Sequence, residues 1–172
     1  FPEAKPEQLK PPPALHDCPI DQRIGLFSMD FTLSPEHQEF ADSVARFAKD
    51  KLAPGALERA HSPHYPWETA KLLSEQGLLG ITFPEEDGGQ GGTLMHAVLA
   101  IQQVALACPK SADIVQAGNF GPIRTFVEYA TPEQKERFLP DLLAGKKLIS
   151  LGMTEPDAGS AVLFTWGSAG RY

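Results

Sequence analysis

Residues 131–140 read TPEQKERFLP and mark the start of a helix more clearly than any other stretch of the chain. Thr131 is suited to cap the helix, and Pro132 fits the first helical position because the N–H that proline lacks would have no partner there. The side chain of Gln134 can return to the cap and complete a capping box. The stretch therefore predicts a helix that begins at residue 132.

The remainder of this helix carries signals for its buried face and for its end. Phe138 and Leu139 are expected to face inward. Pro140 is expected to break or restart the helix, since proline removes a helical hydrogen bond. Gly145 is expected to end it, because glycine adopts the left-handed conformation without strain.

Four further helical stretches are predicted upstream. The first begins at Ser34-Pro35, which repeats the cap-and-proline pattern, and is stopped or kinked at Pro54-Gly55. The others cover residues 67–76, 93–108 and 111–129, with Thr93 as a cap and an irregular region near residues 118–122. Their expected inward-facing residues recur mostly at helical spacing: Phe40, Val44, Phe47 and Leu52; Trp67, Ala70 and Leu73; Leu94, Val98, Ile101 and Ala105; Ile123, Phe126 and Val127.

The predicted fold class is all-α, an orthogonal helical domain of about five helices with a short C-terminal extended segment. Residues 1–30 are expected to form a proline-rich leader or linker, because the run Pro11-Pro12-Pro13 fits neither a helix interior nor a sheet. Residues 31–146 would be the helical domain. The pattern becomes extended over residues 148–154, so residues 147–172 are expected to be the start of a second, β-type domain.

Composition excludes some classes of function. Acidic residues outnumber basic ones by 22 to 15, giving a net charge of −7, so no nucleic-acid partner is expected. No apolar run reaches the roughly 20 residues of a membrane-spanning helix. Cys18 and Cys108 have no zinc-ligand spacing around them and are expected to be reduced thiols, which favours an intracellular location, cytoplasmic or mitochondrial.

Two short motifs allow more than one interpretation. Residues 84–92, PEEDGGQGG, could suggest a phosphate-binding loop, but they lack the Gly-Lys-Ser/Thr ending and carry three acidic residues. A tight turn between helices is the favoured interpretation. His61 and His64 form an H-x-x-H pair, yet a metal site would need further ligands, so surface histidines are favoured.

Three stretches in order resemble the acyl-CoA dehydrogenase family. Residues 77–89 (GLLGITFPEEDGG) are similar to its G-L-x-G-x-x-x-P-E-x-x-G-G segment. Residues 130–140 (ATPEQKERFLP) are similar to its G-T-x-E-Q-K-x-x-x-L-P helix, and residues 153–160 (MTEPDAGS) to its T-E-P-x-A-G-S-D signature. The third stretch is the most specific, and the resemblance covers residues 31 to about 160.

The resemblance implies a fragment of a homo-oligomeric flavoenzyme that holds FAD and oxidises the Cα–Cβ bond of an acyl-CoA. Members have an N-terminal α domain, a middle β domain and a C-terminal helical bundle. The bundle supplies the carboxylate that removes the α proton, so no catalytic residue is expected in this chain and activity on its own is not expected. An acyl-CoA oxidase or flavin monooxygenase relative, and a non-catalytic helical interaction module, are the alternatives.

The residues that match the family's flavin contacts are Leu151, Met153, Thr154, Gly159 and Ser160. Members often have an aromatic residue at the first of these positions, so Leu151 is limited to backbone contact or packing. The hydroxyl of Thr154 can donate to a flavin heteroatom, and Gly159 lets the backbone approach a ligand closely. The N–H and hydroxyl of Ser160 can donate to a pyrophosphate oxygen.

The chain departs from the family at two places. Ala161 stands where the signature has aspartate, a side chain that can fix the turn by local hydrogen bonds. Residues 163–172 (LFTWGSAGRY) do not resemble a continuation into the β domain, and we expect a truncated, alternatively spliced or frameshifted end.

Overall fold

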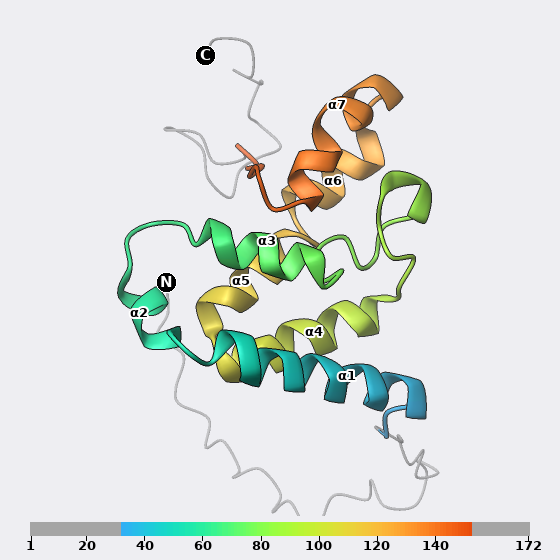
Figure 1. The fold of residues 1–172 in the computed structure, drawn as a ribbon. Helices are drawn as coiled ribbons and strands as arrows, with labels where there is room; N and C mark the ends of the chain where they lie inside the picture. The colour runs from blue at the N-terminus through green and yellow to red at the C-terminus, as the bar shows by residue number, and fades with distance from the viewer. Residues whose placement is uncertain (1–31, 153–172) are drawn as a thin grey trace, which may run out of the picture. The chain divides into compact units, whose positions relative to one another are not determined.

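The computed structural model describes residues 32–152, and these residues form helices and loops with no β-strand among them. The elements in chain order are α1 (Pro35–Phe47), the π-helix η3 (Ala48–Leu52), α2 (Ala56–His61), α3 (Trp67–Glu75), the 3-10 turn η4 (Glu85–Asp87), α4 (Leu94–Ala107), α5 (Pro109–Ala117), α6 (Pro122–Tyr129) and α7 (Pro132–Leu143) (Figure 1). The predicted all-α fold is therefore confirmed.

The helix count differs from the prediction at two places. The stretch over residues 111–129 divides into α5 and α6, because Gly121 has a positive φ of 64° and Pro122 begins a new helix directly after it. Pro109 begins α5 at its first position and does not simply follow the preceding helix. The short helix α2 was not predicted, since it has no buried residue and so no apolar stripe.

The three predicted caps are confirmed. Ser34 Oγ accepts from the His37 N–H at 3.2 Å. Thr131 Oγ1 accepts from the Gln134 N–H at 3.3 Å, and Gln134 Oε1 accepts from the Thr131 N–H at 2.9 Å, which completes the capping box. Thr93 makes the same reciprocal arrangement with a histidine, His96, in place of the usual Glu or Gln.

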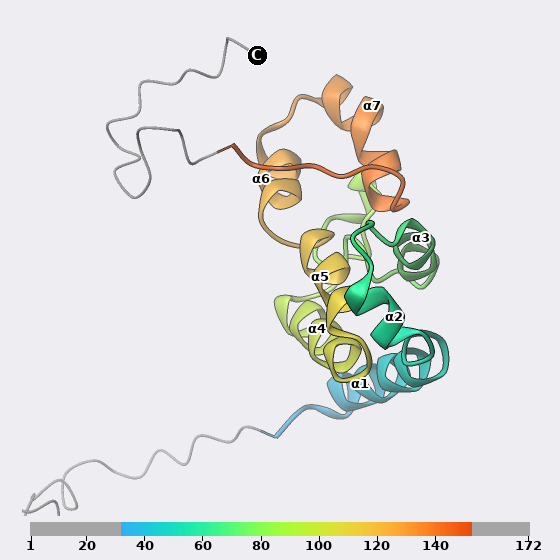
Figure 2. The same ribbon diagram turned by 90° about the vertical axis from the view of Figure 1, so that its left-hand side faces the viewer.

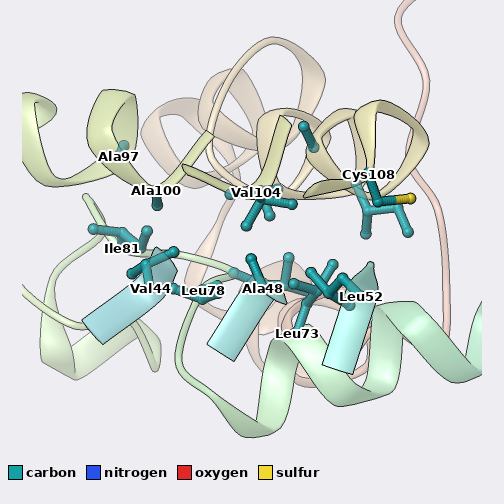
Figure 3. Packing of buried hydrophobic residues seen from close by; sticks show 14 of the residues in the cluster. Val44, Ala48, Leu52, Leu73, Leu78, Ile81, Ala97, Ala100, Val104 and Cys108 are labelled. Atoms are coloured by element: carbon teal, nitrogen blue, oxygen red, sulfur yellow. The ribbon is translucent and has the colours of Figure 1, made fainter. Parts of the chain in front are cut away.

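The larger core lies where α1 and α4 run side by side (Figure 1) and continues onto α3 and α5. A small residue faces a larger one along this contact: Ala100 of α4 lies opposite Val44, and Ala48 lies opposite Val104 (Figure 3), which lets the two helices approach closely. A second, smaller core lies between α6 and α7 and consists of Phe83, Ile123, Val127, Leu139 and Leu142. The second core carries the segment that leads toward the predicted flavin contacts.

The predicted inward-facing residues of α4 are right at two of four positions: Ile101 and Ala105 are partly buried against the larger core. Leu94 is 58% exposed and Val98 is 48% exposed, and the fully buried residues of the helix are Ala97, Leu99, Ala100 and Val104. The sequence of α4 is apolar on almost every side, so spacing alone allows several stripes. The contact with α1 selects the one with small side chains, because those permit the closest packing of the two backbones.

Trp67 and Phe138 were predicted to face inward, and both are on the surface. Trp67 is 45% exposed and packs edge-on against Tyr65 at 4.6 Å between ring centroids. Phe138 is 36% exposed, and the guanidinium of Arg137 lies 4.8 Å from its ring centroid. Large rings can be stabilised by such surface contacts without entering a core.

The predicted break at Pro140 was also wrong, because α7 continues through it to Leu143. Pro140 has no N–H for the carbonyl of Glu136, so one helical bond is missing. Burial of Leu139 and Leu142 on either side holds the helix in place despite this loss. The predicted end at Gly145 is confirmed by its positive φ of 66°.

Asn119 is a buried polar residue that joins α5 to the loop after α3. Its Oδ1 accepts from the Ile81 N–H at 2.6 Å, and its Nδ2 donates to the Leu78 carbonyl at 2.9 Å and to the Val115 carbonyl at 2.8 Å. The side chain has 0% exposure. All its hydrogen-bonding groups but one acceptor lone pair are used, as expected for a buried amide.

Candidate functional site

The segment after α7 leads toward the predicted flavin contacts, and its start is fixed to the helix. The N–H groups of Lys146 and Lys147 both donate to the Asp141 carbonyl, at 2.9 and 3.2 Å. Lys147 Nζ also lies 2.7 Å from the Asp141 carboxylate. This hydrogen bond from Lys147 holds the pKa of the Asp141 carboxyl below its usual value. The direction in which the chain leaves α7 is therefore set by Asp141.

Beyond this point the segment runs past α6 (Figure 2). Ile149 packs against the second core, whereas Leu148 and Leu151 are each 55% exposed. The strand predicted over residues 148–154 is not seen in its described part, residues 148–152, because no other stretch of residues 32–152 pairs with it.

A groove of about 330 Å³ opens between this segment and α6. Pro122, Phe126 and Tyr129 form its helical side, and Ile149, Ser150 and Leu151 form the other. Leu151, the first predicted flavin contact, therefore lies at the rim of a groove with a mostly apolar lining. Met153, Thr154, Gly159 and Ser160 lie outside the described residues, and their roles stay predictions.

The glycine-rich stretch over residues 84–92 forms the tight turn that was predicted. The N–H groups of Gly88, Gly89 and Gly91 donate to the carbonyls of Glu85, Pro84 and Phe83, at 2.9, 3.0 and 2.9 Å. A phosphate-binding loop needs such N–H groups to point at the ligand. Because internal carbonyls occupy them here, the geometry argues against a phosphate cradle.

This turn is tied to α7 by an ion pair. Lys135 Nζ lies 2.8 Å from Asp87 Oδ2, and the two side chains are 27% and 14% exposed. The pair borders a larger groove of about 800 Å³ between the turn and α7, which Glu86, Glu136 and Leu139 also line. Neighbouring acidic residues of 32–152 form no cluster suited to a metal ion.

We predict that Lys135→Met lowers the free energy of unfolding by about 1 kcal/mol, since it leaves the partly buried Asp87 without its partner. Urea denaturation measures the change. Lys71→Met is the matched control, because the Lys71–Glu75 pair is 3.9 Å long and 66% and 57% exposed. Equal effects of the two substitutions would show that the pair does not hold the turn.

The surface position predicted for the H-x-x-H pair is confirmed. His61 and His64 are both exposed, and no metal-binding group of His, Cys, Asp or Glu is present between residues 32 and 152. His37 and His96 hydrogen-bond to the cap residues of α1 and α4, and their rings lie 4.7 Å apart.

None of the helices in this part of the chain is both long and apolar enough to cross a bilayer.

Cys108 is a free thiol buried at the junction of α4 and α5. Ser111 Oγ donates to its Sγ at 3.0 Å. Burial alone would raise the pKa of the Cys108 thiol, but hydrogen bonds from Ser111 and Arg59 outweigh it and hold the pKa below its ordinary value. Cys18 lies outside the described residues.

We predict that Arg59→Met changes how stability depends on pH. A thiol with a lowered folded-state pKa adds stability above its unfolded pKa, and this contribution is lost as pH falls through the folded pKa. The free energy of unfolding of the native chain should therefore rise with pH below the ordinary thiol pKa of about 8.5, and this rise should be smaller in the variant. Urea unfolding across this range measures the slope.

Arg46→Met, which removes an exposed arginine of α1, is the control and should leave the slope unchanged. Arg59 also donates to the Leu52 carbonyl, so a loss of stability that is equal at every pH is expected in addition. A variant with the native slope would show that Arg59 does not stabilise the thiolate.

Asn119 and the Lys135–Asp87 pair are the structural residues that the sequence did not reveal. Asn119 follows a glycine after a helix, a position where exposed turn residues are common, so nothing local indicates burial. Asp87 and Lys135 are 48 residues apart, and no sequence spacing connects them.

The helical part of the chain is similar to proteins of one known family. The sequence profile of the acyl-CoA dehydrogenase N-terminal domain matches residues 34–146. A probable acyl-CoA dehydrogenase of Bacillus subtilis, YngJ, is 38% identical over 132 residues, which are 77% of this chain and 35% of that protein.

Two solved structures have a similar fold over most of this chain. The glutaryl-coenzyme A dehydrogenase–glutaryl-CoA complex matches with a TM-score of 0.69 and 30% identity, over 80% of this chain and 35% of the other. A Mycobacterium smegmatis glutaryl-CoA dehydrogenase in complex with FADH2 matches with a TM-score of 0.68 and 28% identity, over 78% and 35%. The chain spans about a third of the length of the relatives it matches. It belongs to the acyl-CoA dehydrogenase family, and residues 34–146 are its N-terminal domain.

Proposed function

We propose that this chain forms the helical base and part of the flavin site of an FAD-dependent acyl-CoA dehydrogenase. The main support is the position of the sequence signature at residues 153–160. It directly follows the segment that leaves the domain matched by this family. A relative solved with FADH2 and relatives named for acyl-CoA substrates support the same cofactor and substrate class.

The chain's own residues would bind and orient the cofactor. Thr154 would donate its hydroxyl to a heteroatom of the isoalloxazine ring, and Ser160 would donate its N–H and hydroxyl to a pyrophosphate oxygen. Gly159 would allow the backbone to come close, and Leu151 and Met153 would contribute main-chain groups. Bound FAD would supply the acceptor for the hydride that leaves the substrate.

Proton abstraction is not assigned to any residue of this chain. The match covers only about a third of each relative's length, and the acyl-CoA site, the base and the homo-oligomer contacts are proposed for the longer protein of this type. Glu155 is proposed as a residue that fixes the turn, and the boundary near residue 147 as the place where the helical domain ends.

Flavin titration of the full chain tests the proposal. Thr154→Ala and Ser160→Ala should each weaken FAD binding about tenfold, since each removes one hydrogen bond to a charged or polar cofactor group. Thr165→Ala and Ser168→Ala remove the same side chains outside the signature and should bind FAD as the native chain does. Equal affinity in all five proteins would refute the assignment.

A further inference from the structure

Helix α4 leaves a large part of its apolar surface exposed. Its sequence, LMHAVLAIQQVALA, contains no Asp, Glu, Lys or Arg. A helix that is apolar on every side is normally surrounded by other parts of a protein. Here α1 and α5 pack against part of it, and Figure 2 shows α4 at the edge of these helices. Four of its large apolar residues are exposed: Leu94, Met95, Val98 and Leu106.

Most of this exposed surface follows one ridge along the helix. The α4 ridge consists of four exposed residues spaced four positions apart, Leu94, Val98, Gln102 and Leu106. Residues with this spacing stand next to each other on a helix. The buried residues Ala97 and Ala100 lie on the opposite side, which belongs to the larger core. The α4 ridge therefore points away from α1.

The α4 ridge is complementary to itself. Rows of residues four positions apart interlock in the commonest class of helix packing. If a second copy of α4 runs antiparallel, with a two-fold axis near residue 100, Leu94 of each copy lies beside Leu106 of the other. Val98 then lies beside Gln102 of the other copy. Such a pair is closed, because the same surface serves on both chains.

Charge favours this surface for contact between two copies of the chain. Each copy has a net charge of −7, so contacts through acidic surfaces would bring carboxylates together. The α4 ridge brings none, since no charged residue lies on the helix. The amide of Gln102 can both donate and accept, so the two central polar side chains can pair across the axis.

We propose that two copies of this chain associate through the α4 ridge as an antiparallel, two-fold symmetric pair of helices. With 14 residues, α4 is about 21 Å long. One helix face of this length buries less than the about 800 Å² that each partner contributes to a standard interface. The dimer is therefore weak, forming at about 100 μM chain and dissociating near about 1 μM. The proposal goes beyond the flavin site and does not depend on FAD binding.

Sedimentation velocity of the full chain over this concentration range tests the proposal. The weight-average sedimentation coefficient of the native chain should rise with concentration. Leu106→Arg should raise the dissociation constant at least tenfold, because it places a charge in an apolar contact. The added charge is positive, so general repulsion between acidic chains cannot account for the loss.

Leu57→Arg is the matched control, because Leu57 is 75% exposed on α2, close to the 78% of Leu106, and the change of charge is the same. This variant should associate as the native chain does. Circular dichroism should show native helix content in both variants, since each replaced side chain is exposed. A native chain that stays monomeric at about 100 μM would overturn the proposal. Equal dissociation constants for the two variants would overturn it as well.

Charge complementation tests the antiparallel arrangement. Leu94→Glu should by itself weaken association, as Leu106→Arg does. Mixed in equal amounts, these two variants should associate again, because the new carboxylate of one chain meets the new guanidinium of the other. A mixture that associates as weakly as either variant alone would overturn the antiparallel arrangement.

Discussion

Replacing Asn119 with alanine is expected to lower the free energy of unfolding by about 3 kcal/mol or more. The substitution leaves the Ile81 N–H and the carbonyls of Leu78 and Val115 without the partner that each has in the native chain. An unsatisfied buried group costs about 1 to 3 kcal/mol, and the side chain is fully buried, so water cannot replace it without rearrangement. Urea denaturation monitored by circular dichroism measures the change.

Gln102→Ala is the control for Asn119→Ala. Gln102 is an exposed amide on α4, and its removal should change stability by less than about 0.5 kcal/mol. A loss at Asn119 no larger than that of the control would mean that the amide does not hold the 78–81 loop to α5. The Gly80 N–H, which donates to the Gly118 carbonyl at 2.9 Å, would then be the main connection.

Gly145→Ala is expected to be the second strongly destabilising substitution, by about 2 to 4 kcal/mol. Gly145 has a φ of 66°, and a Cβ there would lie 2.7 Å from the backbone carbonyl of Ala70. The strain of the left-handed conformation and a clash with backbone therefore act together. Because Gly145 begins the segment that runs to Leu151, the clash would also displace the proposed flavin segment.

Gly88→Ala separates these two causes. Gly88 is also in the left-handed conformation, with a φ of 80°, but a Cβ there would come no closer than 3.4 Å to another atom, the tip of the Leu143 side chain. Its substitution should cost about 1 kcal/mol, the strain of the conformation alone. Equal losses at the two glycines would show that the contact with Ala70 relaxes freely.

Local signals account for the parts of the fold that the sequence predicted. Ser34, Thr93 and Thr131 cap helices through atoms within three residues, so neighbours far along the chain have no influence. The tight turn before α4 was predictable for the same reason. The family resemblance also rested on local strings, and the profile match over residues 34–146 agrees with it.

Packing decided what local signals could not. The stripe of α4 that is buried depends on α1, because an apolar helix offers several equivalent faces. The helix through Pro140 depends on the burial of Leu139 and Leu142, which outweighs a missing hydrogen bond. Asn119 and the Lys135–Asp87 pair join residues about 40 to 50 positions apart, beyond the reach of any spacing rule.

The candidate site, too, was predicted from the sequence only in part. The sequence identified the signature of residues 153–160 through its resemblance, but not the groove beside Leu151. Phe126 and Tyr129, which line that groove, lie on α6, a separate helix. The sequence predicted one helical stretch over residues 111–129 and so did not indicate the groove.

The central claim is that residues 151–160 bind a flavin. Amide chemical-shift mapping tests it most directly, since the method detects weak binding by a chain that spans a third of its relatives. On titration of the isotope-labelled full chain with FAD up to millimolar concentration, the account predicts shifts at Leu151, Met153, Thr154, Gly159 and Ser160. Absence of shifts there, or shifts confined to residues 35–143, would contradict it.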